Sequence, residues 1–325
     1  MAQVSCQTPL CDEWLATPRR YESGYARAVE PNSKGLIMPA EARRMSKILK
    51  RTVCTSITAL NASGIEHPDA IITGTGMGCM ENTEKFAIDL CKYGESCLKP
   101  TLFMQSTHNT ISSLIAIILK CHGYNNTYTH GGGSFENALF DAWLQIKGDM
   151  IRNALVGAHD EVTPFMYLVM GNTHPEYRFV SETSVSAMVS SSKGSEQDIE
   201  IADVRILSRS SAEEVAELLS AETDPVIMLG VNGNDANDAR YRKLLGSLGW
   251  QPATLQYKET FGENYSASAI GFYASATMLR EGKFPDFMRY AGVLPENPDR
   301  ITIINNPEGD TWTLIRLKKE TSCGN

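Results

Sequence analysis

Strand patterns that end in glycine turns and lead directly into helix patterns recur along this chain, and they restrict the folds open to it. In residues 126–142, NTYTHGGGSFENALFDA, three glycines separate a strand pattern from an amphipathic helix pattern. Residues 70–78 and 226–233 each show an apolar strand pattern that ends in glycines. Because such units alternate along the chain, the sequence predicts an α/β fold whose sheets are covered largely on both faces.

The order of the patterns also suggests two similar halves. Residues 71–78 in the first half and 227–233 in the second both read as a strand, a glycine turn and then a helix. We predict a helical region from Pro39 that ends at Gly64, a helix over 266–281, a buried helix over 109–121, and a closing hairpin of 301–304 with 312–317. Strand patterns also occur at 153–157, 167–170 and 184–190. The predicted organisation is an N-terminal arm (1–37), an N-terminal half (38–165) and a C-terminal half (166–325) that form one structural unit.

Charge and cysteine usage exclude several classes of function. The 325-residue chain has a formal charge of −8 and no basic stripe, which argues against nucleic acid as a partner. The start of the chain is acidic and the longest apolar run, 114–119, is too short to span a bilayer, so we expect a cytoplasmic protein without membrane insertion. Eight cysteines are scattered without CxxC pairs, which favours reduced thiols over disulfides or a zinc site. We expect no metal and no cofactor.

The glycine turns allow two interpretations, a structural one and a functional one. The turn GTGMG at 74–78 lacks the GxGxxG spacing of a dinucleotide site, so it favours close backbone packing over nucleotide binding. A strand-to-helix elbow such as 126–142 is a usual place for a nucleophile or a phosphate. Gly131, Gly132 and Gly133 offer no such side chain there and would also permit positive φ or a close helix-to-strand contact.

Five segments together resemble the β-ketoacyl synthases of the thiolase-like superfamily. They are GTGMG (74–78), QSTHN (105–109), YNNTYTHGGGSFENAL (124–139), VGAHDE (156–161) and KETFGENYSASA (258–269). The resemblance covers roughly residues 38–317 and is most specific over 100–161. It is closest to the ketosynthase-like proteins of bacterial aryl-polyene pathways, including chain-length-factor subunits. This resemblance implies a five-layered αβαβα fold built of two similar halves.

By the same resemblance, all three catalytic positions of a synthase are altered. Gly132 takes the place of the cysteine that a working synthase carries at the start of the elbow helix, where the helix dipole and backbone N–H groups favour a thiolate. Glu263 takes the place of one catalytic histidine and Asn232 corresponds to the other, and the six histidines of the chain all lie at or before His174. A carboxylate at 263 would repel an enolate. We expect no Claisen condensation.

The departures from the family extend beyond these three positions. The N-terminus is expected to lack the family's opening strand, and residues 305–309 (NNPEG) stand where a Gly-Phe-Gly-Gly gate loop is expected. Lys258 matches a lysine that synthases bury, and we expect it to pair with Glu263 or Glu136.

Some residues could rebuild a site. Ser134 and His130 are close enough in sequence to form a catalytic Ser-His pair. The structural interpretation is preferred, because a serine at a helix start commonly accepts hydrogen bonds from the free backbone N–H groups. Asn109 is expected to cap its helix, and His108 is read as a hydrogen-bonded structural group. The sequence places Met77, Met80, Met104, Met166 and Met170 in the core in preference to an acyl tunnel.

The leading hypothesis is a condensation-inactive homologue that acts as the chain-length-factor-like partner of an active ketosynthase in fatty-acid or polyketide-type chain biosynthesis. The acyl carrier protein would be an indirect partner, because it delivers substrate to the active subunit. Two alternatives remain: a homodimeric acyl-binding protein, and an acyl-thioester enzyme (decarboxylase, acyltransferase or hydrolase) that reuses Ser134, His130 or Glu263. The pathway and the acyl chain are left open.

Overall fold

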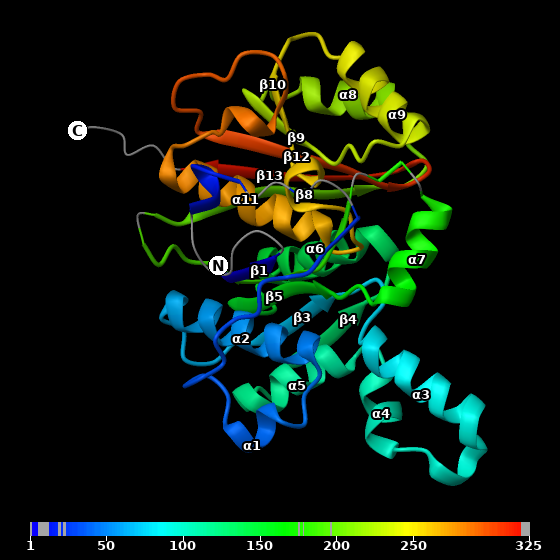
Figure 1. The fold of residues 1–325 in the computed structure, drawn as a ribbon. Coiled ribbons are helices and arrows are strands. Elements are labelled where there is room, and N and C mark those ends of the chain that lie inside the picture. Colours follow the sequence, from blue (N-terminus) through cyan, green and yellow to red (C-terminus); the bar gives the residue numbers. More distant parts are fainter. Residues whose placement is uncertain are drawn as a thin grey trace.

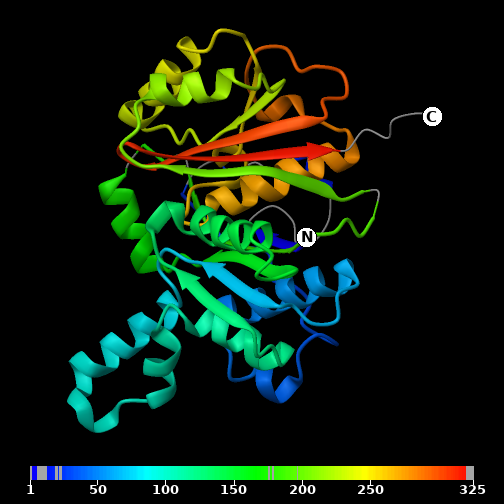
Figure 2. The ribbon, with the colours of Figure 1, turned by 180° about the vertical axis from the view of Figure 1, so that it is seen from behind.

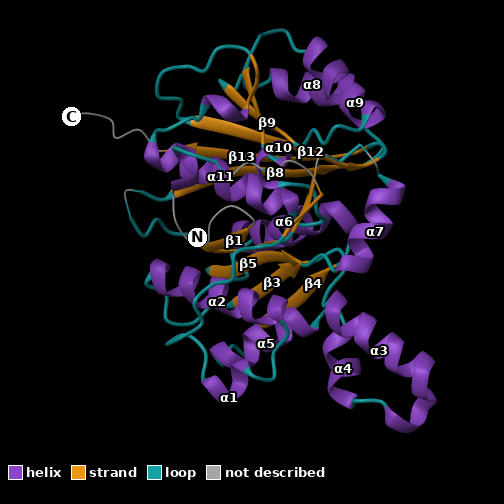
Figure 3. Cartoon of the chain, viewed as in Figure 1, coloured by secondary structure: helices purple, strands orange, loops and turns teal. Residues whose placement is uncertain are grey.

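A computed structural model describes residues 2–5, 13–18, 21, 24–174, 176–177, 179–195 and 197–319. Two β-sheets alternate with three layers of helices, as Figures 1 and 3 show. The first sheet has the order β1-β7-β5-β3-β4 and the second the order β11-β10-β9-β12-β13-β8. A third, two-stranded sheet joins β2 (Gly24–Ala26) to β6 (Phe179–Ser181). The predicted five-layered α/β architecture is confirmed.

The strands are bounded as follows. The first sheet contains β1 (Ala2–Ser5), β3 (Ala70–Gly74), β4 (Tyr124–Tyr128), β5 (Asn153–Asp160) and β7 (Thr183–Ser190). The second contains β8 (Ile199–Leu207), β9 (Val226–Leu229), β10 (Ala253–Gln256), β11 (Arg289–Ala291), β12 (Arg300–Glu308) and β13 (Thr311–Lys319).

The helices occupy three layers and a projection. The layer outside the first sheet holds α1 (Pro39–Ala42), α2 (Lys47–Ser63) and α5 (Thr110–Leu119), and the middle layer holds α6 (Ser134–Lys147) and α11 (Ala267–Glu281). The layer outside the second sheet holds α8 (Ala212–Ser220) and α9 (Asp235–Gly246). In Figure 1, α3 (Met80–Tyr93) and α4 (Pro100–Ser106) project from the body, while α7 (Pro164–Thr173) runs along its side. The short α10 (Lys258–Phe261) precedes α11.

The two large sheets repeat one topology. In the first sheet, β3 is parallel to β4 and β5, and β7 is antiparallel to β5 and β1. In the second, β9 is parallel to β10 and β12, and β13 is antiparallel to β12 and β8. Numbered along the chain within each sheet, both have the order 3-2-4-5-1, with β11 added at one edge. The repeat inferred from the sequence is therefore present, and α6 and α11 occupy equivalent places in it.

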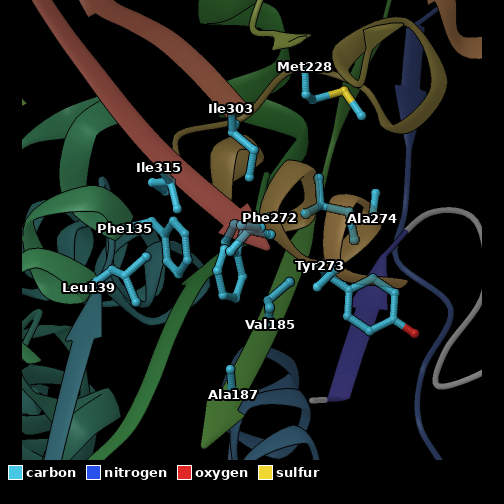
Figure 4. Packing of buried hydrophobic residues seen from close by; sticks show 14 of the residues in the cluster. Phe135, Leu139, Val185, Ala187, Met228, Phe272, Tyr273, Ala274, Ile303 and Ile315 are labelled. Carbon is cyan, nitrogen blue, oxygen red and sulfur yellow. The ribbon is translucent and has the colours of Figure 1, made fainter. Parts of the chain in front are cut away.

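The main core fills the space around α6 and α11 (Figure 4). Phe135 of α6 contacts Phe272 of α11, with ring centroids 5.3 Å apart. Val185 of the first sheet and Ile303 of the second pack against the same cluster, so one core joins both halves. The smaller cluster on the outer face of the second sheet includes Tyr241 and Trp312. A shared core of this kind holds the two halves as one unit.

Local signals place several helix ends as expected. Gly64 follows α2 with φ +70°, the left-handed conformation that glycine adopts readily at a helix C-terminus. A capping box fixes the start of α8, because the Ser211 side chain accepts from the N–H of Glu214, whose side chain accepts from the N–H of Ser211. Asn109 precedes α5 as predicted, but its side chain makes no capping hydrogen bond.

Three predictions are wrong. Residues 167–170 form part of α7 and not a strand, because Pro164 and the Thr163 cap start a helix whose Met166 and Met170 face the core. The opening strand is present, since β1 pairs antiparallel with β7. The helix over 109–121 is not fully buried, because Ile117 of α5 is 72 % exposed.

The lead-in is packed against the body where it is described. Trp14 is buried against Phe261, and the buried Arg51 of α2 pairs with Glu30 and Glu182. The proposed division near residue 165 stays a prediction. Among the described residues no single helix is long and apolar enough to cross a membrane, and one bent pair, α4 with α5, meets such criteria only by length and composition.

Candidate functional site

The glycine elbow joins β4 to α6 through a single 3-10 turn, Gly131–Gly133. Of the three glycines only Gly131 has a positive φ, at +52°. A Cβ atom built on Gly132 or Gly133 would meet its neighbours at ordinary van der Waals distances. The positive φ therefore accounts for glycine at 131, whereas neither backbone strain nor crowding accounts for glycine at 132, the position at which the resemblance places a nucleophile.

The closing hairpin of the second sheet covers this elbow. Pro307 of β12 lies 3.5 Å from the point where a Gly132 side chain would begin, and the Asn305 amide donates to the Gly132 carbonyl oxygen at 3.3 Å. The register of β12 against β13 is interrupted between Asn305 and Glu308. The space left by the missing side chain thus borders a segment of the same chain.

Ser134 and His130 do not form a catalytic pair in this structure. Ser134 is fully buried, and its hydroxyl accepts from the backbone N–H of His130 at 2.9 Å and lies 2.7 Å from the carbonyl oxygen of Gly131. The exposed imidazole of His130 packs near the ring of Tyr128. A serine committed to backbone groups in this way has no base to remove its proton.

A second elbow, equivalent to the first in the repeat, joins α10 to α11. Gly262 has φ +88°, and its backbone approaches the side chains of Phe179 and Ser181 closely. The ammonium of Lys258 and the carboxylate of Glu263 form an ion pair at 2.9 Å, and their side chains are only 10 % and 11 % exposed. The predicted pairing of these two residues is confirmed. The Glu263 carboxylate is therefore neutralised by a lysine of the same chain.

Asn232, where the resemblance places the other catalytic histidine, lies in the turn before α9. Its side-chain oxygen accepts from the N–H of Asn234 and from the amide of Asn237, and its own N–H donates to Asp238. These contacts fix the turn that precedes α9, whose N-cap is Asn234. The residue is therefore engaged in local structure and presents no imidazole-like donor.

Glu136 is the buried carboxylate nearest to the glycine elbow in sequence. It accepts hydrogen bonds from Asn305 at 2.7 Å, Thr313 at 3.0 Å and Ser268 at 2.8 Å, with no cation among these partners. Complete burial raises the pKa of Glu136, although these donors oppose the shift. The alternative pairing of Lys258 with Glu136 is not formed. Glu136 instead links α6 to β12, β13 and α11.

Asp160 joins the second elbow to the first glycine turn, and it was not among the residues predicted from the sequence. It accepts from Thr75 at 2.9 Å, from the N–H groups of Gly76 and Met77, and from Ser266 at 2.6 Å. Burial raises the pKa of Asp160 and these donors lower it. Its segment, VGAHDE, was part of the resemblance, and an acid at the end of a buried strand was the available signal.

Little open volume remains beside these residues. A cavity of about 10 Å³ lies between Asp160, Glu161, Tyr265 and the methionines of α7, which is room for about one water molecule. Met77, Met80, Met166 and Met170 belong to a core cluster there, as predicted. The prediction is wrong for Met104, which is 68 % exposed. Burial raises the pKa of Glu161 to about 7. Among the described residues, no group of three or more His, Cys, Asp or Glu side chains could hold a metal ion.

Two glycine substitutions test this description of the elbow. Gly132→Ala is expected to leave the free energy of unfolding unchanged or to raise it by up to about 1 kcal/mol, because alanine restricts the unfolded chain. Gly74→Ala places a Cβ 2.6 Å from the backbone of Ser134, and is expected to cost roughly 2–4 kcal/mol because the backbone has to move. Urea unfolding of the two variants measures both. Equal losses would show that Gly132 is a structural glycine.

The comparisons agree with this geometry. The family described as β-ketoacyl synthase, N-terminal domain, matches residues 14–237. The structure is similar to a chain from a complex of a type II polyketide synthase acyl-carrier protein with its ketosynthase (TM-score 0.77, 12 % identity, covering 95 % of this chain and 92 % of that one). It is also similar to the ishigamide ketosynthase/chain length factor (TM-score 0.74, 15 % identity, covering 98 % of this chain and 98 % of that one). A third similar structure is a β-ketoacyl synthase from Burkholderia phymatum STM815 (TM-score 0.76, 11 % identity, covering 95 % of this chain and 91 % of that one).

No curated protein sequence matches the chain significantly. The repeated α/β architecture and its two facing elbows define a thiolase-like ketosynthase fold. The chain belongs to the β-ketoacyl synthase family, as the match over 14–237 shows.

Proposed function

We propose that this protein is a condensation-inactive member of its family and acts as the chain-length-factor-like partner of an active ketosynthase. The observation that carries the proposal is the glycine elbow: no nucleophile stands at Gly132, and Pro307 lies against that position. The second elbow supports the same conclusion, because Glu263 is held by Lys258 and no histidine follows His174 in the chain. A carboxylate there does not stabilise an enolate.

The proposed contact surface is the free edge of the first sheet. β4 pairs only with β3 among the described strands, so one side of its backbone is open to a strand from another chain. Figure 2 shows this border of the sheet from behind. Exposed apolar side chains lie on β4, on α5 and α6, which contact β4, and on α4, which contacts α5. We call these side chains the edge surface: Phe103, Met104, Ile117, Tyr124 and Leu144.

The occupant that we propose for the edge surface is an active ketosynthase subunit. One of the structurally similar proteins is described as a ketosynthase/chain length factor and another as a ketosynthase bound to an acyl-carrier protein. In our proposal the carrier protein serves the active subunit, in the cytoplasm, and this chain helps to shape the cavity for the growing acyl chain. Aryl-polyene or a related acyl-chain pathway is the proposed setting.

Co-expression tests the proposal. We expect a one-to-one complex by native mass spectrometry when the chain is produced with the ketosynthase encoded nearest to it. The complex should also show no covalent adduct on this chain after incubation with acyl or malonyl thioesters, because no activated nucleophile is available. Peptide mapping separates an adduct at Ser134 from adventitious acylation of an exposed thiol such as Cys91.

Two other results would contradict the proposed partner-subunit function. A homodimer that carries a co-purified acyl ligand would favour the acyl-binding alternative. Stoichiometric acylation of Ser134, lost in Ser134→Ala and in His130→Gln, would favour the enzyme alternative.

A further inference from the structure

The buried carboxyl group of Glu161 lies against the first turn of the projecting helix α3. Glu161 directly follows β5 and is only 5 % exposed. It accepts a hydrogen bond from the backbone N–H of Glu81, in the first turn of α3, at 2.9 Å. The first N–H groups of a helix have no acceptor within the helix and carry partial positive charge. A side chain from a distant segment therefore caps α3.

Few other contacts hold α3 to the body of the protein. Asn82 is its one buried residue, and the Asn82 amide donates to Gln105 of α4, within the projection. The Thr163 hydroxyl, which caps α7, donates to Glu84. Met80 packs against the methionines of α7. These contacts with the body lie within residues 80–84, and the rest of α3 points away from the sheets in Figure 1.

Glu161 is buried without a counter-charge. Among the residues that the structure describes, none forms an ion pair with it within 4.0 Å. Arg51 already pairs with Glu30 at 2.6 Å and with Glu182 at 2.9 Å. The titratable or charged groups around Glu161 come from each neighbouring element: Tyr25 of β2, Arg51 of α2, Cys79 and Glu81 at the start of α3, Asp160 of β5, Glu182 between β6 and β7, and Tyr265 before α11. Most of these groups are acidic, so the cluster favours a proton on Glu161.

We propose that the contact between Glu161 and the first turn of α3 is a pH-sensitive switch. When Glu161 carries a proton, its carbonyl oxygen still accepts from Glu81 and α3 stays docked. When Glu161 is ionised, its buried charge has no paired cation, and the carboxylate gains hydration if α3 moves away. The inference concerns the chain by itself and goes beyond the proposed partner-subunit function.

The direction of the switch follows from the pKa of Glu161 in the two positions. Burial raises this pKa from 4.5 to about 7, although the N–H of Glu81 and the charge of Arg51 oppose the shift. In the released position the carboxyl group is exposed to water, so its pKa returns towards 4.5. The docked position therefore binds the proton more tightly, and docking weakens as the pH rises towards 7. Between about pH 5.5 and about pH 7.5, the ratio of released to docked α3 should rise roughly 20-fold.

Hydrogen exchange of the full chain, measured by mass spectrometry at about pH 5.5 and about pH 7.5, tests the proposal. Each exchange rate is divided by the rate of an unstructured peptide at the same pH, which removes the chemical effect of pH on exchange. A 14-residue helix is marginally stable in water by itself, so the amides of α3 lose protection when it is released. We expect the protection of Met80–Tyr93 to fall roughly 20-fold over this pH range, while that of α8 changes less than about threefold.

Glu161→Gln is the main variant, because glutamine keeps the acceptor and cannot ionise. In this variant α3 should be as protected at about pH 7.5 as it is in the wild type at about pH 5.5. The matched control, Glu296→Gln at an exposed position, should keep the wild-type pH dependence. Glu84→Ala removes the hydrogen bond from Thr163, and should raise release roughly fivefold at each pH with the same pH dependence.

Two exchange patterns would overturn the switch. Wild-type pH dependence in Glu161→Gln would show that another group titrates. Equal loss of protection in α3 and α8 would show that the whole chain unfolds. If Glu161→Gln does not fold, the wild-type profile still decides, because unchanged protection of α3 between the two pH values excludes the switch. Each of these results leaves the co-expression experiment unaffected.

Discussion

Asp160→Ala is expected to lower the free energy of unfolding by about 3–5 kcal/mol, because it leaves several buried donors without an acceptor. The donors are the hydroxyls of Thr75 and Ser266 and the N–H groups of Gly76 and Met77. They come from the first glycine turn and from the start of α11, so one carboxylate joins both halves. Chemical denaturation followed by far-UV circular dichroism measures the effect.

Controls distinguish this role from a general effect of removing an acid. Asp203→Ala breaks an ion pair with Arg205 near the surface and should cost less than about 1 kcal/mol. If Asp160→Ala does not fold, Ser266→Ala and Thr75→Val remove one donor each. Together with their double mutant, they measure whether the two donors are coupled through Asp160. Additive, small losses in that cycle would contradict the proposed link.

Ile117→Glu is expected to abolish the complex with the active ketosynthase while the fold stays intact. Ile117 is 72 % exposed in the isolated chain, so a charge costs little there until a partner covers it. Burying an unpaired carboxylate in an interface opposes association by several kcal/mol, which corresponds to roughly a 100- to 1,000-fold loss of affinity. Met104→Glu, on α4 of the same edge surface, should act in the same direction.

The matched control for these variants is Val293→Glu. Val293 is 85 % exposed but lies outside the edge surface, in the second half of the chain. Native mass spectrometry and thermal unfolding of each variant separate loss of binding from loss of folding. If Val293→Glu disrupted the complex and Ile117→Glu did not, the partner would occupy a different face.

Much of the fold could be predicted because its signals are local. The strand at Ala70–Gly74, the helix ending at Gly64 and the hairpin of β12 with β13 follow from apolar period and glycine position. The pairing of β1 with β7 could not be read in this way, because it joins segments about 180 residues apart. The repeat was visible only as two similar turns until the strand orders could be compared.

The same distinction between local and long-range signals applies to the candidate site. The pairing of Lys258 with Glu263 could be inferred from sequence because the resemblance aligned that segment, whereas the loss of a nucleophile at Gly132 stays a prediction. Pro307 over the elbow could not, because it depends on the register of a distant hairpin. The group of cations around the α1–α2 connection could not be predicted for a different reason: its members come from three segments of an acidic chain, and no single stretch is strongly basic.

The repeated topology bears on what this fold would need in order to carry out a condensation. α6 and α11 start at equivalent points of two copies of one folding pattern, and by resemblance an active synthase draws its cysteine from one and a histidine from the other. Pro307 lies over the first elbow, and Lys258 binds Glu263 at the second. A cysteine introduced at position 132 would still face a second elbow whose carboxylate is paired with a lysine. We therefore expect that restoring one side chain alone does not create a condensing site.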